Sequence, residues 1–191
     1  MYYICTIKQQ HNTIMELKQS VVSNLHLVSE LVKQEKENIF KSSVVNEFEK
    51  VINNYVIRKR LFCGGCCYAS YLLAKALKML NIEYKVVIFQ YDMALDLTDF
   101  SELMSLQADG CAHVAIEVTI AGNKHIIGTY DKIVEYFTTY GYYYKMQHYD
   151  NVQPETLLEF YRMGYWNHMY DVRNNAALSR HINSITEKYS D

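Results

Sequence analysis

Apolar residues recur at steps of three and four near the start of the chain, which is the spacing of one face of an α-helix. The charged run at residues 33–37 predicts the solvated end of this helix. Ser42 and Ser43 then predict the N-terminal cap of a second helix. The two apolar faces are Ile14, Leu17, Val21, Leu25, Val28 and Leu31 for the first helix, and Val44, Val45, Phe48, Val51, Ile52 and Tyr55 for the second.

The most apolar helical stretch follows a loop of glycine and cysteine and runs from Cys66 to Leu80. It has almost no polar face, so it predicts a central, buried helix. Asn81 is a residue type that ends helices in the left-handed conformation. Residues 84–91 are rich in Val, Ile and Phe and predict a strand. Residues 92–110 form a polar connection after it.

Residues 112–120 alternate with the period of a β-strand. A turn at 121–123 and a returning strand at 124–130 complete a predicted hairpin. The two faces of the first strand are Val114, Ile116, Val118 and Ile120 on one side, and His113, Ala115, Glu117 and Thr119 on the other.

The last third of the chain is rich in tyrosine and predicts two more helices, at residues 154–165 and 175–188. Helices, then a small antiparallel sheet, then helices again predict an α+β fold. We expect one domain over residues 1–191. It consists of a helical part at 1–60, a core at 61–131 and a Tyr-rich helical part at 132–191.

Composition narrows the classes of function. The formal net charge of −2 argues against a nucleic-acid or anionic-membrane partner. No run approaches the ~20 apolar residues of a membrane span, and the N-terminus lacks the pattern of a secretory signal. The chain has 5 cysteines, an odd count, and three of them lie at residues 63–67. We therefore expect a reducing, cytoplasmic location with thiols that react or bind rather than form disulfides.

Cys66 opens the predicted buried helix. The free N–H groups and the dipole of a helix N-terminus stabilise an anion, so the pKa of a thiol there falls. Gly64 and Gly65 let a substrate carbonyl approach and let backbone amides face an oxyanion. Cys66 is therefore the candidate nucleophile, and Cys67 is the second candidate because it also follows a Gly-x pair.

His113 is the candidate base, because it begins a strand on the face with small or polar neighbours. The third member depends on the turn of the hairpin. A three-residue turn at 121–123 sets His113 opposite Asp131, with Cβ atoms about 5 Å apart on one face. Asp131 would then hold the imidazole tautomer. A two-residue turn at 122–123 would send Asp131 to the other face.

These residues resemble a known family. The sequence GGCCYASYLL at residues 64–73 is similar to the Gly-x-Cys nucleophile helix of transglutaminase-like proteins, which share the papain-like fold. HVAIEV at residues 113–118 resembles the histidine strand of that family, and Tyr130-Asp131 lies where its aspartate closes the next strand. The resemblance covers roughly residues 60–131. It implies a buried nucleophile helix packed on a small antiparallel sheet, and a site of Cys66, His113 and Asp131.

The predicted function is cysteine-dependent acyl transfer or amide hydrolysis on a protein or peptide substrate, with no cofactor and no metal. One alternative is zinc binding, because Cys63-x-x-Cys66 and Cys111-x-His113 have zinc-like spacing. A second is a thioredoxin-like redox site, which the lone Pro154 argues against because that fold places a cis-proline before a strand. A third is an inactive structural or interaction protein that keeps the fold.

Overall fold

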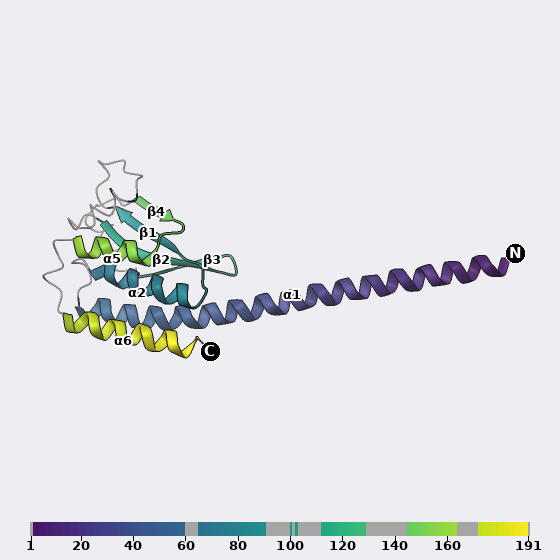
Figure 1. Ribbon diagram of the computed structural model, residues 1–191, viewed down its shortest axis with the longest axis horizontal. Coiled ribbons are helices and arrows are strands. Elements are labelled where there is room, and N and C mark those ends of the chain that lie inside the picture. The colour runs from purple at the N-terminus through teal and green to yellow at the C-terminus, as the bar shows by residue number, and fades with distance from the viewer. Residues whose placement is uncertain are drawn as a thin grey trace. The chain divides into compact units, whose positions relative to one another are not determined.

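The computed structural model describes residues 2–59, 65–90, 100, 102, 112–128, 145–163 and 172–190. The chain forms two compact units, Met1–Phe40 and Lys41–Asp191, and each is described by itself. The described residues form helices and an antiparallel sheet, so the α+β class is confirmed (Figure 1). The elements are α1 (Tyr2–Lys59), α2 (Gly65–Met79), β1 (Lys85–Gln90), β2 (Ala112–Ile120), β3 (Asn123–Ile127), β4 (Lys145–Tyr149), α5 (Pro154–Met163) and α6 (Val172–Lys188).

Helix α1 is continuous, so the prediction of two N-terminal helices is wrong. The run at residues 33–37 lies inside it, and Ser42 and Ser43 are interior residues of the helix rather than its N-terminal cap. The physical reason is that residues 2–59 contain no proline and no glycine, and the Lys and Glu side chains of the charged run are themselves good helix formers. The apolar stripe predicted for the second helix is nevertheless largely buried, at Val44, Val45, Phe48 and Ile52.

Helix α2 is the centre of the second unit, as predicted, and Asn81 ends it. Asn81 adopts a φ of 54°, and its N–H donates to the carbonyl of Lys78 at 3.2 Å. The N–H of Ile82 donates to the carbonyl of Leu77 at 2.9 Å. These two bonds form a Schellman motif, which satisfies carbonyls at the end of the helix. Leu77 and Ile82 are both buried, so the motif also carries its usual apolar pair.

The four strands form one antiparallel sheet in the order β3-β2-β1-β4. Strand β2 has the predicted bounds, and β1 lies within the predicted residues 84–91. Strand β4 was missing from the sequence prediction. Residues 113–118 of β2 are buried without exception, so both faces of the central strand are covered in this stretch.

The hairpin of β2 and β3 has a two-residue turn, Ala121 and Gly122. Both residues have positive φ, 49° and 79°, which is the backbone of a type I′ turn. Ile120 pairs with Asn123 rather than with residue 124. The predicted three-residue turn and its register are therefore wrong, and the two-residue alternative at 122–123 is wrong as well.

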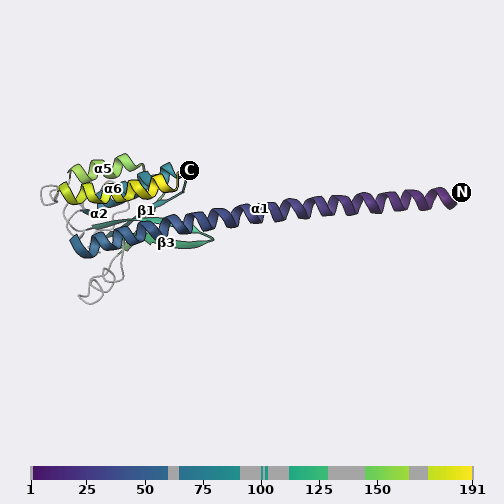
Figure 2. The same ribbon diagram turned by 90° about the horizontal axis from the view of Figure 1, so that it is seen from below.

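Helix α2 connects the layers of the second unit, because it packs against β2, α5 and α6. The Oγ of Ser70 donates to the carbonyl of Val114 at 3.2 Å and fixes α2 on β2. Figures 1 and 2 show α2, α5 and α6 together on one side of the sheet. The two predicted C-terminal helices are confirmed as α5 and α6, and Pro154 begins α5.

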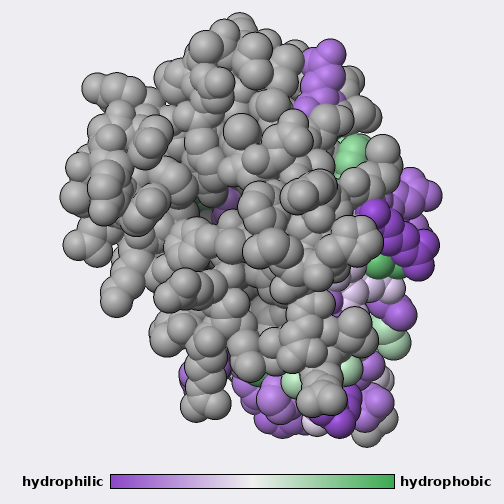
Figure 3. Space-filling model, turned by 90° about the vertical axis from the view of Figure 1, so that its left-hand side faces the viewer, coloured by the Kyte–Doolittle hydropathy of each residue, from purple (hydrophilic) through white to green (hydrophobic). Residues whose placement is uncertain are grey.

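The surface of the described part is largely polar where Figure 3 displays it. Most of the coloured side chains there are hydrophilic, and the hydrophobic areas are small and separate. Among the described residues, no helix combines the length and the apolar character that crossing a membrane requires.

Candidate active site

Cys66 is the second residue of α2, so its sulfur lies at the helix end that carries free backbone N–H groups. The residue is buried, with 5% of its surface exposed, and its thiol is not in a disulfide. This is the setting that the sequence predicted for a nucleophile. Gly65 and Cys66 belong to the first turn of the helix, the position from which backbone N–H groups can face an oxyanion.

His113 lies near the start of β2, opposite Phe89 of β1, and is 4% exposed. Its Nε2 lies 2.8 Å from the carbonyl oxygen of Gly128. A carbonyl only accepts, so Nε2 carries the proton of this hydrogen bond. The second ring nitrogen, Nδ1, is thereby left for another partner. The Phe89 ring packs beside the imidazole, with centroids 6.0 Å apart.

Cys66 is a hydrogen-bond partner of the His113 side chain. Burial alone lowers the pKa of His113, because it disfavours the imidazolium. The negative charge of Cys66, its hydrogen bond and the carbonyl of Gly128 act in the opposite direction and prevail, so the pKa is raised. The structure therefore brings together the two residues that the sequence selected as nucleophile and base.

Cys67 has a different environment from Cys66. It is fully buried, and its Sγ donates to the carbonyl oxygen of Leu157 in α5 at 3.2 Å. Burial, and then the neighbouring charge of Cys66, raise the pKa of the Cys67 thiol well above its ordinary value. A thiol that stays protonated is a poor nucleophile, so the geometry favours Cys66 over Cys67.

Gly128 was missed by the sequence reasoning, although it holds the imidazole. Its φ is 99°, a conformation that side chains with a Cβ rarely adopt. A Cβ at this position would lie 3.7 Å from the Cα and Cβ of Ala115, which is ordinary contact distance. The backbone conformation, rather than space, therefore requires glycine. A glycine inside the predicted returning strand at 124–130 was the available signal.

Asp131 lies outside the described residues, as do Cys63 and Cys111. The register that set Asp131 opposite His113 is not the observed one, because the pairing of β2 with β3 is shifted by one residue from the predicted pairing. Asp131 thus loses its geometric argument and keeps only the family resemblance.

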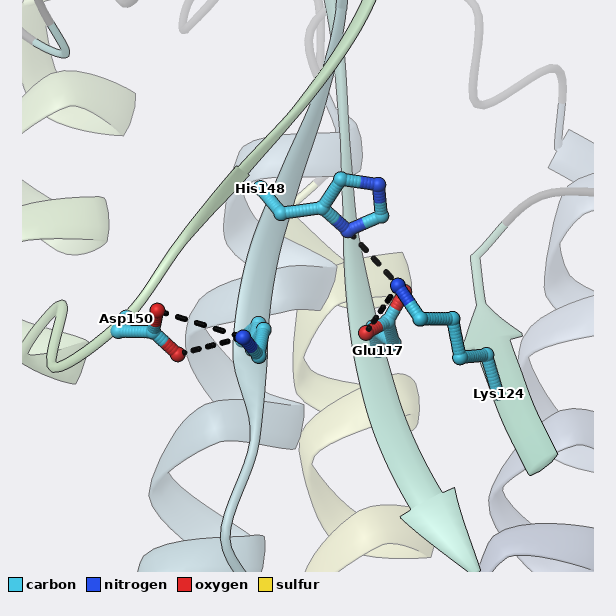
Figure 4. Close-up of polar contacts among 5 residues, drawn as sticks. Glu117, Lys124, His148 and Asp150 are labelled. Carbon is cyan, nitrogen blue, oxygen red and sulfur yellow. Dashed lines mark hydrogen bonds and ion pairs between the residues drawn. The ribbon is translucent and has the colours of Figure 1, made fainter. Parts of the chain in front are cut away.

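A second polar cluster surrounds Glu117 in the middle of β2 (Figure 4). This carboxylate has only 1% of its side chain exposed. Its Oε2 lies 3.0 Å from Nδ1 of His148, and its Oε1 lies 3.5 Å from Nζ of Lys124. The atoms are at ion-pair distance without the geometry of a hydrogen bond. His148 is half-buried in β4, with 25% of its side chain exposed.

A cavity of about 690 Å³ opens near the C-terminal end of α2, where Lys78 and Asn81 line it. Neither Cys66 nor His113 belongs to its lining, so it is separate from the candidate active site. Within the described part of the chain, no three His, Cys, Asp or Glu side chains gather as they would around a metal ion.

The arrangement supplies the parts of a thiol-based acyl-transfer site. They are a sulfur at a helix N-terminus, an imidazole hydrogen-bonded to that sulfur, and a carbonyl that fixes the imidazole tautomer. These parts come from α2, β2 and the residue after β3. No protein-family model, curated protein or solved structure matches this chain.

Proposed function

We propose that this chain is a cysteine-dependent enzyme that attacks a carbonyl of a protein or peptide substrate, with Cys66 as nucleophile and His113 as base. The observation that carries the proposal is the hydrogen bond of Cys66 and His113 at the start of a buried helix. Burial of both groups excludes water and strengthens their interaction. No cofactor enters the proposed reaction.

In the first half-reaction the Cys66 proton moves to Nδ1 of His113, and the sulfur forms a bond to the carbonyl carbon. The former carbonyl oxygen becomes an oxyanion, which the N–H groups of Gly65 and Cys66 would stabilise. His113 then returns the proton to the leaving amine as the C–N bond breaks. The product is a thioester on Cys66. Throughout, the Nε2–H of His113 continues to donate to Gly128.

In the second half-reaction water or an amine attacks the thioester carbonyl. His113 removes the proton of the attacking group, and the thiolate leaves. Water gives amide hydrolysis and an amine gives acyl transfer. Because the nucleophile works only as a reduced thiol, the proposal includes a reducing compartment such as the cytoplasm.

The finer fold assignment, papain-like and transglutaminase-like, belongs to the same proposal. The sequence resemblance at residues 64–73 and 113–118 supports it. So does the arrangement of a helix bearing a cysteine at its start against an antiparallel sheet bearing a histidine. Asp131 is retained as a third member only through the resemblance. The carbonyl of Gly128 supplies an orienting contact that does not depend on Asp131.

The test is transfer of an acetyl group from p-nitrophenyl acetate, followed by mass spectrometry of the digested protein. We expect a burst of nitrophenolate and a single acetyl group on Cys66. Cys66→Ser should abolish the burst, and His113→Ala should slow it by about 10²-fold or more. The matched control is Cys67→Ser, which should leave the burst intact.

Acetylation spread over several side chains and unchanged by Cys66→Ser would overturn the proposal in favour of an inactive protein that keeps the fold. Zinc in the purified protein at one ion per chain, released by a chelator together with new thiol reactivity at Cys63 and Cys66, would favour the metal alternative. Addition of a primary amine after the burst distinguishes hydrolysis of the thioester from acyl transfer to the amine. Amide formation indicates a transferase, and release of acetate indicates a hydrolase.

A further inference from the structure

The part of α1 in the first unit exposes an unusual amount of apolar surface. Nine large apolar side chains between residues 15 and 32 are each 49–65% exposed. Six of them share one side of the helix at helical spacing and together expose roughly 550 Å², near the upper end of the 300–600 Å² of the largest apolar patch on a typical monomer. They are Leu17, Val21, Leu25, Val28, Leu31 and Val32. A contact between two such stripes would bury roughly 1,100 Å² in total, which is above the ~1,000 Å² expected of a specific interface.

The exposed residues follow the spacing of a helix–helix seam. Val21, Leu25, Val28 and Val32 succeed one another at steps of four, three and four. In the sequence, the positions seven and fourteen residues before Val21 are apolar as well, Ile14 and Ile7. A seven-residue apolar repeat keeps one stripe facing a neighbouring helix of the same repeat.

A polar face lies opposite the middle of this seam. Ser23, His26 and Glu30 lie on one face at helical spacing, and all three are exposed. The Oγ of Ser23 donates to the carbonyl of Gln19 at 2.9 Å and so stays on its own helix. The seam is bounded by polar residues at the same repeat, Lys18 before Leu25 and Glu35 after Val28, so its apolar part is centred on residues 21–32.

A lipid surface fits this helix poorly. Helices that lie on membranes are rich in Lys and Arg and carry aromatic residues on the apolar face. Residues 15–39 contain no aromatic residue, and their Lys count is below their Glu count. The stripe thus has the apolar surface of a small protein interface without the charge of a membrane anchor.

We propose that this stripe, centred on Val21, Leu25, Val28 and Val32, is the contact by which copies of this chain associate. A second copy presents the same stripe with the same repeat and length, so one symmetric contact covers both faces. Most of the stability of a helix in a protein comes from packing of its apolar face, and a second copy supplies that packing. The proposal does not depend on the proposed function, since its residues lie in the other unit.

The experiment is size-exclusion chromatography with light scattering on the full chain across a dilution series. We expect a mass at least twice the 22.4 kDa of one chain. Leu25→Glu with Val28→Glu places two charges in the seam and should return the mass to that of one chain. The matched control, Ser23→Glu with His26→Glu, has the same spacing and charge on the polar face and should keep the oligomer.

Val21→Asn is a second seam variant, which adds no charge and should shift dissociation to higher protein concentration. A wild-type chain that stays monomeric overturns the proposal, and so does an equal effect of the seam pair and the control pair. Sedimentation with vesicles of phosphatidylcholine and phosphatidylserine tests whether a lipid surface covers the stripe instead of a second copy. Binding of wild-type monomer to vesicles, lost in the seam pair, would assign the stripe to lipid instead.

Discussion

At the scale of single residues, two opposite effects act on the pKa of His113, and the effect of its polar neighbours exceeds that of burial. Burial disfavours the imidazolium, and by itself would keep the ring neutral. The charge and hydrogen bond of Cys66, with the carbonyl of Gly128, favour the imidazolium and raise the pKa. A thiolate and an imidazolium that stabilise each other are the ground state from which a cysteine nucleophile acts.

The pKa of His113 should depend on Cys66. In Cys66→Ser no thiolate forms, so burial becomes the dominant effect and the pKa should fall below its ordinary value of about 6.5. In the wild type it should lie above that value. The measurement is an NMR titration of the imidazole Cε1–H. Equal pKa values in the two proteins would show that the charge of Cys66 does not act on the ring.

The same shift predicts how stability changes with pH. The pKa of His113 in the folded chain is higher than in the unfolded chain, so its protonation stabilises the fold. This contribution is fully present below about pH 6.5 and is lost as the pH rises through the raised pKa. Urea unfolding at several pH values should show the decline in the wild type. Cys66→Ser should remove it.

Gly128 and Gly122 form a matched pair for testing the orienting carbonyl. Both have positive φ, 99° and 79°, so Gly→Ala at either should destabilise the fold by about 1–2 kcal/mol. Only Gly128 contacts His113, so only Gly128→Ala should also slow alkylation of Cys66. The same loss of reactivity in both variants would mean that stability, rather than the carbonyl, controls the thiol.

The neighbourhood of Cys66 and His113 could be predicted from the sequence better than the contacts that orient them. Cys66 and His113 were found because a thiol after glycines and a histidine opening an alternating strand are local signals. Gly128 was not found, because which carbonyl reaches an imidazole depends on strand register. Register depended on one turn residue: Ala121 accepts positive φ here, which a sequence argument does not anticipate for alanine.

At the scale of elements, the end of α2 controls where β1 begins. The Schellman motif at Asn81 turns the chain so that buried Ile82 lies beside Leu77. Asn81→Ala should cost about 1 kcal/mol, because alanine tolerates left-handed φ poorly, and Asn81→Gly should equal or exceed the wild-type stability. Urea unfolding of the three proteins checks this. The same stability for alanine and glycine would contradict the motif's importance.

The Glu117 cluster links strands that are not neighbours, because His148 in β4 reaches across β1 to β2. His148→Ala should destabilise the fold by roughly 1–3 kcal/mol, since it leaves a buried carboxylate with one fewer partner. Lys124→Ala, the control, should cost less than about 1 kcal/mol because Lys124 is 62% exposed. Adding Glu117→Gln to His148→Ala should recover part of the loss. Thermal unfolding measures all four proteins.

Elements with a strong period were predictable and weak ones were not. Strand β2 was found at its observed bounds because its alternation is complete. Strand β4 was missed because its residues, Lys145–Tyr149, have one large aliphatic side chain and no alternation, and pairing with β1 decides their conformation. The break predicted in α1 was wrong because a charged run and serines do not stop a helix that lacks glycine and proline.

At the scale of the whole molecule, the two proposals belong to different units. The thiol, the imidazole and the Gly128 carbonyl all belong to Lys41–Asp191, where a hydrogen bond from Ser70 joins α2 to β2. The apolar stripe belongs to Met1–Phe40. Dissociation of the oligomer by the seam variants should therefore leave the acetylation of Cys66 in place, and loss of the nucleophile should leave the oligomer in place.

The most direct measurement of the central claim is the rate of iodoacetamide alkylation at each cysteine as a function of pH, read by mass spectrometry. We predict that Cys66 reacts first, with an apparent pKa clearly below the free value of about 8.5, and that His113→Ala moves this pKa upward. Cys67 should react only on unfolding, because it is fully buried. Alkylation of Cys66 no faster than of Cys67, or with an apparent pKa at or above 8.5, would contradict the account.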